Sequence, residues 1–157
     1  MKTNRTGNKG VRRALAPRRQ FGALPWRLGD GVEILLASSR GSRRWIIPKG
    51  WPMKGRKPHA AAKREAMEEA GLVGRIDKRK IGSFHYEKSL KNGSLALCRV
   101  DVFPLSVERQ RKRWREQAER VTRWFPYDVA AEEVREVELK RLIVAFGQAI
   151  GVSSIQI

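Results

Sequence analysis

Residues 50–72 read GWPMKGRKPHAAAKREAMEEAGL, and their second half is typical of a helix. Pro58 suits a first-turn position, and the alanines at 60–62 are strong helix formers. Gly71 is placed to end the helix, because glycine tolerates the left-handed backbone of a C-terminal cap. The spacing therefore predicts one helix from Pro58 to just before Gly71.

Three glutamates lie on this predicted helix at positions i, i+3 and i+4: Glu65, Glu68 and Glu69. Residues so spaced share a face of roughly 100°, and their like charges repel one another. Carboxylate oxygens are ligands that Mg²⁺ or Mn²⁺ prefers, and such an ion would attract a phosphate-bearing substrate. The alternative is a solvated acidic face in which Glu68 pairs with Arg64. Helix periodicity alone favours this alternative.

The exact spacing resembles the Nudix box, G-x5-E-x7-R-E-U-x-E-E-x-G-U, in which U is an apolar residue. The matching positions are Gly50, Arg64, Glu65, Ala66 (a small U), Glu68, Glu69, Gly71 and Leu72. The chain departs from the pattern at the first glutamate, where it has Arg56. Outside the box, three short stretches resemble the diphosphoinositol polyphosphate phosphohydrolase branch of the family: SSR at 38–40, WIIP at 45–48 and RWF at 123–125. The resemblance covers about residues 30–136.

The resemblance implies a Nudix α/β/α sandwich with a mixed central sheet, and hydrolysis of a diphosphate linked to another group. It implies that Mg²⁺ or Mn²⁺ is held by Glu65, Glu69 and Glu68, with the backbone carbonyl of Lys49 as a further ligand. Glu68 is the candidate general base, because a carboxylate beside the metals can accept a proton from water. An extra acid near the metals is implied from Glu116 or Glu119.

Substrate phosphates need cationic and hydroxyl partners. Ser39 and Arg40 follow a predicted strand; a polar turn is the alternative interpretation, and the resemblance favours substrate binding. The further candidates for phosphate contacts are Arg18, Arg19, Lys54 and Arg56. Arg56 stands where the family has the glutamate that pairs with Arg64. We therefore expect Arg64 to find another acid, such as Glu68, and Arg56 to face the substrate.

Charge is strongly unbalanced, with 34 Lys+Arg against 16 Asp+Glu and a net charge of +18. Such a field attracts polyanions. The favoured partner is a polyphosphorylated small molecule, such as a diphosphoinositol polyphosphate or a dinucleoside polyphosphate. The competing interpretation is a nucleic-acid-binding protein with an inactive box, suggested by the charge and by Trp114 and Trp124 among arginines. The sequence leaves the oligomeric state open.

We expect a flexible basic tail over residues 1–19 and a single domain over 20–157. No apolar run reaches the roughly 18 residues of a membrane span, and the N-terminus has no apolar core of a secretory signal. We therefore expect no membrane partner and a cytoplasmic location. Cys98 is the only cysteine, which excludes an internal disulfide and is compatible with a reducing compartment.

The remaining pattern predicts strands joined by turns, with an Asn92–Gly93 hairpin. Pro25 argues that the first strand is an edge or carries a bulge. The predicted strands are 21–27, 32–37, 43–47, 73–86, 94–105 and 121–125. The charged stretch 106–120 is a helix or a loop. A helix starts at 127–128, and an amphipathic C-terminal helix carries apolar residues from Leu139 to Ile150.

Overall fold

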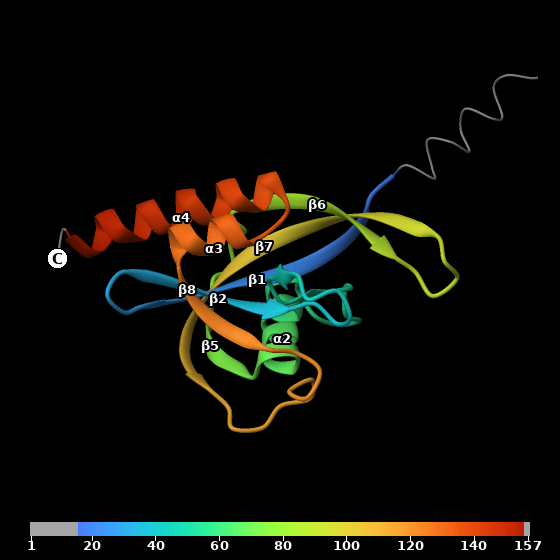
Figure 1. The fold of residues 1–157 in the computed structure, drawn as a ribbon, viewed down its shortest axis with the longest axis horizontal. Helices are drawn as coiled ribbons and strands as arrows, with labels where there is room; N and C mark the ends of the chain where they lie inside the picture. Colours follow the sequence, from blue (N-terminus) through green and yellow to red (C-terminus); the bar gives the residue numbers. More distant parts are fainter. Residues whose placement is uncertain (1–15, 156–157) are drawn as a thin grey trace, which may run out of the picture.

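The computed structural model describes residues 16–155 and shows a sheet between helices (Figure 1). The strands are β1 (Arg18–Leu28), β2 (Val32–Ser38), β3 (Trp45–Ile46), β4 (Lys49–Gly50), β5 (Leu72–Ile76), β6 (Gly82–Ser89), β7 (Leu95–Gln110) and β8 (Thr122–Pro126). The helices are α2 (Pro58–Ala70), α3 (Tyr127–Glu133) and α4 (Val137–Ile155). No helix within the described range is both long and apolar enough to cross a bilayer.

The sheet is mixed. Its main path runs β3-β2-β1-β7-β5, while β4 pairs with β1, β6 with β7 and β8 with β2. β1 and β7 are parallel along nine residue pairs, from Arg18↔Cys98 to Trp26↔Ser106. The remaining pairings are antiparallel. The mixed sheet confirms the predicted α/β class.

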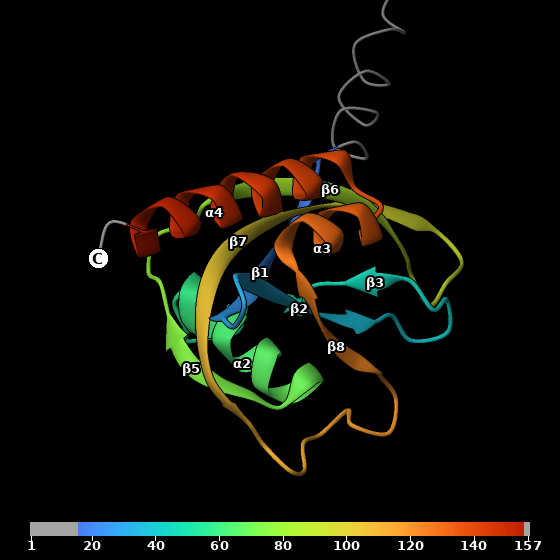
Figure 2. The same cartoon turned by 60° about the vertical axis from the view of Figure 1, so that its left-hand side comes forward.

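Each face of the sheet is covered by helices, as Figure 2 shows. On one face, alanines of α2 pack in a cluster with Phe21, Leu35 and Phe103. On the other face, α3 and α4 close over Leu24, Ile34 and other apolar strand residues. Alternate side chains of a strand point to opposite faces, so a sheet with two apolar faces needs a helix layer on each. The α/β/α sandwich is therefore present.

Helix α2 begins at Pro58 and ends before Gly71, as predicted. Gly71 has φ +69°, a left-handed conformation that side chains disfavour, and its backbone N–H donates to the carbonyls of Ala66 and Met67. The C-terminal helix is also confirmed: Leu139 and Ile143 are buried on its inner face. The stretch from residue 127 forms α3.

The first strand differs from the prediction at both its start and its place in the sheet. β1 begins at Arg18, so the last two residues assigned to the basic tail pair with β7; residues 1–15 of that tail lie outside the described residues. β1 is a central strand and not an edge. Pro25 has no backbone N–H to donate, but it lies between two antiparallel pairings of β1 and belongs to neither. The pairing with β4 includes Phe21 and Gly22, and the pairing with β2 starts at Trp26, so the proline is tolerated there.

Two further boundaries differ. The predicted strand 73–86 is two strands, since residues 77–81 leave the sheet between β5 and β6. Both strands pair with β7, which continues to Gln110 because β5 provides a partner for its second half. The charged stretch 106–120 is therefore neither a helix nor all loop: it starts as strand, and only its remainder forms the loop that leads to β8.

Candidate active site

A polar pocket of about 600 Å³ opens where β4, α2, β6 and the loops after β2 and β7 meet. Four carboxylates line it: Glu65, Glu69, Glu87 and Glu116. Five cationic side chains line it as well: Arg40, Arg44, Lys49, Lys88 and Arg120. These groups come from segments far apart in the sequence, and the sheet brings them together.

Glu65 lies against the backbone of Gly50. A β-carbon added at Gly50 would collide with both carboxylate oxygens of Glu65. Gly50 is itself fixed, because it pairs with Phe21 of β1. The glycine of the box is therefore required by this close approach, which holds the Glu65 carboxylate at the pocket.

Glu69 is nearly completely buried, with 6% of its surface exposed. Its carboxylate accepts a hydrogen bond from the Lys49 backbone N–H at 3.3 Å and lies 3.7 Å from the Arg120 guanidinium. Burial raises the pKa of Glu69, and the charges of Arg120 and Lys49 oppose that rise only in part. Burial disfavours the charged form of Lys49 as well, and therefore lowers its pKa. The Lys49 ammonium lies 4.7 Å from the ring centre of Tyr86.

Glu65 shares this crowded environment. Burial, together with repulsion from Glu68 and Glu116, raises the pKa of Glu65 to about 7. Carboxylates held together in this way are stabilised by an added cation, and oxygen donors suit Mg²⁺ or Mn²⁺. The donor chemistry therefore fits a divalent ion. Within residues 16–155, no group of three or more His, Cys, Asp or Glu side chains is arranged as a ready metal site.

Glu68, the candidate base, is turned away from this group. Its carboxylate pairs with Arg64 at 2.8 Å and lies 3.7 Å from Arg115. The pairing expected for Arg64 is thus present. Because Arg56 replaces the glutamate that pairs with this arginine elsewhere in the family, Arg64 pairs instead with Glu68, one turn further along the same helix.

The two candidates for an extra acid are placed differently. Glu116 lines the pocket and lies 3.0 Å from the Arg120 guanidinium and 3.6 Å from that of Arg40. Glu119 lies outside this pocket and pairs with Arg40 at 3.3 Å. Of these two candidates, Glu116 is therefore the one that the fold brings to the pocket with the glutamates of α2.

The loop carrying Glu116 is docked on the C-terminal end of α2, where the last carbonyls of a helix have no partner within it. Four consecutive carbonyls accept hydrogen bonds from this segment: Glu68 from the Glu116 N–H (3.0 Å), Glu69 from Trp114 Nε1 (3.2 Å), Ala70 from Gln110 Nε2 (2.9 Å) and Gly71 from the Arg111 N–H (2.8 Å). The position of Glu116 is thereby tied to that of Glu69.

Among the predicted phosphate ligands, Ser39 and Arg40 line the pocket. The Ser39 hydroxyl accepts a hydrogen bond from the Arg44 N–H at 3.1 Å and contacts Ser42. The other candidates lie elsewhere. Lys54 and Arg56 are exposed on the loop before α2, Arg18 is exposed on β1, and Arg19 pairs with Asp101 at 3.2 Å; none of the four lines the pocket.

Sequence reasoning missed several groups in this pocket, among them Arg44, Arg120, Trp51 and the Lys49 side chain. Arg120 has only 7% of its side chain exposed and joins Glu69, Glu116 and the Ser38 carbonyl. The Lys49 side chain and Trp51 also line the pocket. Arg120 stands in a run of charged residues with no spacing pattern, so the sequence carries no signal that separates it from its neighbours.

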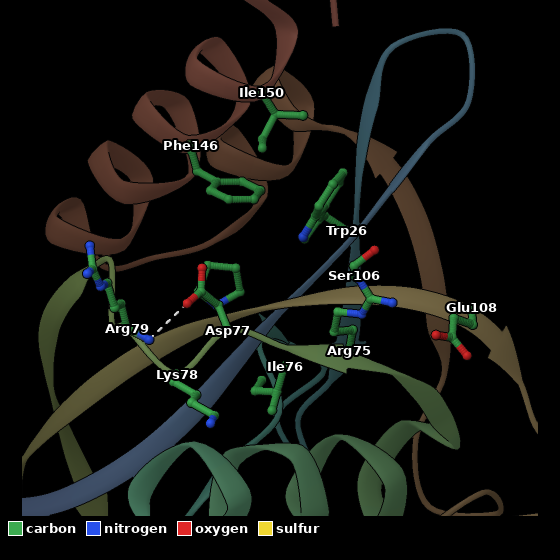
Figure 3. Close-up of a pocket in the computed structure, with 11 residues that line it drawn as sticks. Trp26, Arg75, Ile76, Asp77, Lys78, Arg79, Ser106, Glu108, Phe146 and Ile150 are labelled. Atoms are coloured by element: carbon green, nitrogen blue, oxygen red, sulfur yellow. Dashed lines mark hydrogen bonds between the residues drawn. The ribbon is translucent and has the colours of Figure 1, made fainter. Parts of the chain in front are cut away.

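A second hollow, of about 780 Å³, lies between α4, β5 and β7 (Figure 3). Trp26, Phe146 and Ile150 supply apolar walls, and Figure 3 shows Asp77 turned toward the Arg79 N–H, which donates to it at 2.9 Å, with Glu108 set apart. Although this hollow is larger, its two carboxylates do not form a cluster. The cluster of carboxylates and cations lies in the smaller, polar pocket, which is therefore the candidate active site.

A mixed sheet between helices, with carboxylates of one helix facing a cationic wall, is the arrangement that the Nudix resemblance predicts. The profile of the NUDIX domain matches residues 16–145, and the chain therefore belongs to the NUDIX family.

Three similar proteins illustrate the relationship. Nudix hydrolase 18, mitochondrial, of Arabidopsis thaliana is 27% identical over 98% of this chain and 89% of its own. Diphosphoinositol polyphosphate phosphohydrolase 3-alpha of Mus musculus is 33% identical over 62% of this chain and 56% of its own. The structure of C. elegans Ap4A hydrolase has a TM-score of 0.60 and 19% identity, covering 86% of this chain and 99% of that one. The last likeness supports the fold.

Proposed function

We propose that this enzyme hydrolyses a phosphoanhydride in a strongly anionic substrate, in the manner of enzymes acting on a nucleoside diphosphate linked to another group. The observation that carries the proposal is the arrangement of Glu65, Glu69 and Glu116 in one pocket with Arg40 and Lys88. Cations bind the terminal phosphate oxygens, and the carboxylates face the bond to be cleaved. Names of relatives point the same way, to diphosphoinositol polyphosphates and to Ap4A.

Divalent Mg²⁺ or Mn²⁺ is part of this proposal. Glu65, Glu69 and Glu116 would hold it, together with the carbonyl of Lys49. When bound, such an ion neutralises phosphate charge and makes a coordinated water more acidic. Burial, with a smaller contribution from neighbouring carboxylates, raises the pKa of Glu65 and Glu69. This supports the assignment, because each carboxylate needs positive charge nearby to ionise fully.

Glu68 is proposed as the general base that accepts the proton of the attacking water. It leaves its ion pair with Arg64 to do so. That pair is only partly exposed, with 42% of the Arg64 side chain and 18% of the Glu68 side chain accessible to water, so the rotation has a cost that binding of the metal and substrate must offset. Arg40 and Arg44 bind the phosphates and stabilise the negative charge of the transition state.

Binding of nucleic acid by an inactive domain is the rival proposal. Its basis is the exposed basic stretch from Arg109 to Arg115. Stacking on bases would need free aromatic side chains. Trp114 donates to the Glu69 carbonyl, and Arg27 covers Trp124 at 4.0 Å, so both rings are already engaged. The presence of Glu65, Glu68 and Glu69 on the box helix also favours the enzyme.

The test is phosphate release from a panel of substrates: Ap4A, ADP-ribose, a diphosphoinositol polyphosphate and capped RNA, each with Mg²⁺, Mn²⁺ or EDTA. We expect release that requires the metal and that falls at least about 100-fold in Glu65→Gln and Glu68→Gln, within the range of general acid–base effects. Glu133→Gln, at an exposed position of α3 that does not line the pocket, is the matched control. Absence of turnover on every substrate, with salt-sensitive RNA binding, would favour the rival.

A further inference from the structure

Trp51 differs from the other tryptophans of the chain. Of the five, four have a partner: Trp26 packs on Phe146 (5.6 Å between ring centres), Trp45 packs on Phe125 (5.1 Å), Trp114 donates to the Glu69 carbonyl (3.2 Å), and Trp124 lies under Arg27 (4.0 Å). Within residues 16–155, Trp51 makes no hydrogen bond, ring contact or cation contact, and 38% of its surface is exposed.

Its position is next to the reacting groups. Trp51 directly follows Gly50, whose backbone abuts Glu65, and it lines the same pocket. Pro52 and Met53 line the pocket beside it, so this stretch of the wall is apolar. A large aromatic side chain left partly in water beside an acidic cluster gains free energy when a ligand covers it.

The walls of the pocket therefore differ in chemistry. Arg40 and Arg44 come from the loop after β2, and Lys88 comes from β6, whereas the segment after β4 supplies no charge at residues 51–53. A substrate that carries phosphates all around its ring, such as an inositol polyphosphate, needs cationic side chains on every wall of the pocket. A nucleoside polyphosphate has one anionic chain and one planar aromatic base, which matches a pocket with cationic and apolar walls.

We propose that Trp51 is a specificity-determining residue that stacks on an aromatic base, and that the substrate class is the nucleoside polyphosphates. This inference rests on the proposed hydrolase function. Base–aromatic stacking typically changes affinity by about 5- to 150-fold per base. In this role Trp51 determines which substrates bind and does not position the carboxylates.

The test compares the binding of two probes by calorimetry in Mg²⁺: a methylene-bridged, non-hydrolysable analogue of Ap4A, and inorganic tripolyphosphate. Trp51→Ala is expected to weaken binding of the analogue about tenfold and to leave tripolyphosphate within about twofold. Trp51→Phe, which keeps a ring, is expected to restore most of the affinity. Leu28→Ala is the control, because Leu28 is another exposed apolar residue and lies outside the pocket.

Equal weakening for both probes in Trp51→Ala would overturn the proposal, as would unchanged binding of the analogue. Turnover of the substrate panel by the wild-type chain is measured on the same preparation. Turnover together with binding that does not depend on Trp51 refutes the stacking role alone. Binding that depends on Trp51, with no turnover in any metal, refutes the hydrolase function and leaves a nucleotide-binding site.

Discussion

The indole nitrogen of Trp114 donates a hydrogen bond to the backbone carbonyl of Glu69, 3.2 Å away. The same ring packs so closely on Gly71 that a β-carbon there would collide with it. The residue that ends α2 and the loop that supplies Glu116 are therefore one structural unit. This unit sets the position of the Glu116 carboxylate relative to the two pocket carboxylates on the helix, Glu65 and Glu69.

Trp114→Phe tests this relationship, since it removes the N–H donor and keeps a ring. We expect a loss of about 1 kcal/mol in the free energy of unfolding, typical of one hydrogen bond, and a lower kcat because Glu116 is less well positioned. Trp114→Ala is expected to lose about 2–3 kcal/mol through lost packing as well. Urea unfolding and steady-state kinetics measure the two effects. Arg113→Ala, an exposed neighbour, is the control, and equal kinetics in all three variants would contradict the positioning role.

Gly50→Ala tests the close approach of Glu65 to the backbone. The added β-carbon meets the far end of a flexible side chain, so we expect the fold to persist and the carboxylate to move. Activity should fall at least about tenfold, since small displacements of reacting groups have large effects on rate, while the Tm changes by only a few degrees. Gly151→Ala, where a β-carbon meets nothing within 4 Å, is the matched control in helix α4 and should keep full activity. Unchanged activity in Gly50→Ala would contradict the geometry.

The environment of Asp101 leads to a prediction of how the free energy of unfolding depends on pH. It is buried, and burial alone would raise its pKa, but the Ser83 hydroxyl and the cations Arg19, Lys80 and Arg99 outweigh burial, so its pKa is lowered. A carboxyl group with a lowered folded-state pKa stabilises the fold above its unfolded pKa of about 3.9, and this contribution is lost as pH falls through the folded value. We therefore expect the free energy of unfolding to decrease on acidification from pH 5 to pH 2.

Asp101→Asn should flatten this acid dependence and lower the free energy of unfolding at pH 7 by about 2–3 kcal/mol, because the charge-assisted hydrogen bond from Ser83 and the ion pairs are lost. Urea unfolding at a series of pH values measures both effects. Asp30→Asn, at an exposed turn, should leave the profile as in the wild type. An acid slope as steep in Asp101→Asn as in the wild type would assign the slope to other carboxylates.

The sequence was most informative where structure is local. Glu65 and Glu69 share a helix face because of their spacing, and Gly71 ends the helix because of its own backbone freedom, so both could be predicted. β7 could not be bounded, since its extension to Gln110 depends on a partner strand distant in sequence. Arg120 belongs to the same class, because its contacts come from β2, α2 and the loop after β7 and exist only after folding.

Arg120 also gives a prediction about metal removal. Its guanidinium is buried between Glu69, at 3.7 Å, and Glu116, at 3.0 Å, and supplies positive charge to the carboxylates proposed to hold the ion. Arg120→Gln leaves a buried carboxylate without its partner, and breaking a buried ion pair typically costs about 3–5 kcal/mol. In EDTA we expect a Tm lower than that of the wild type by several degrees.

Added Mn²⁺ should restore much of this loss, because a divalent ion supplies the missing positive charge and binding to the folded state stabilises it. The rise in Tm on adding Mn²⁺ should therefore be larger for Arg120→Gln than for the wild type, as measured by calorimetry with and without the metal. Arg40→Gln is the control: the Arg40 side chain is 62% exposed, so water screens its ion pairs with Glu116 and Glu119, which contribute about 0–1 kcal/mol. A Tm deficit of the same size in Mn²⁺ and in EDTA would show that Arg120 and the metal do not share these carboxylates.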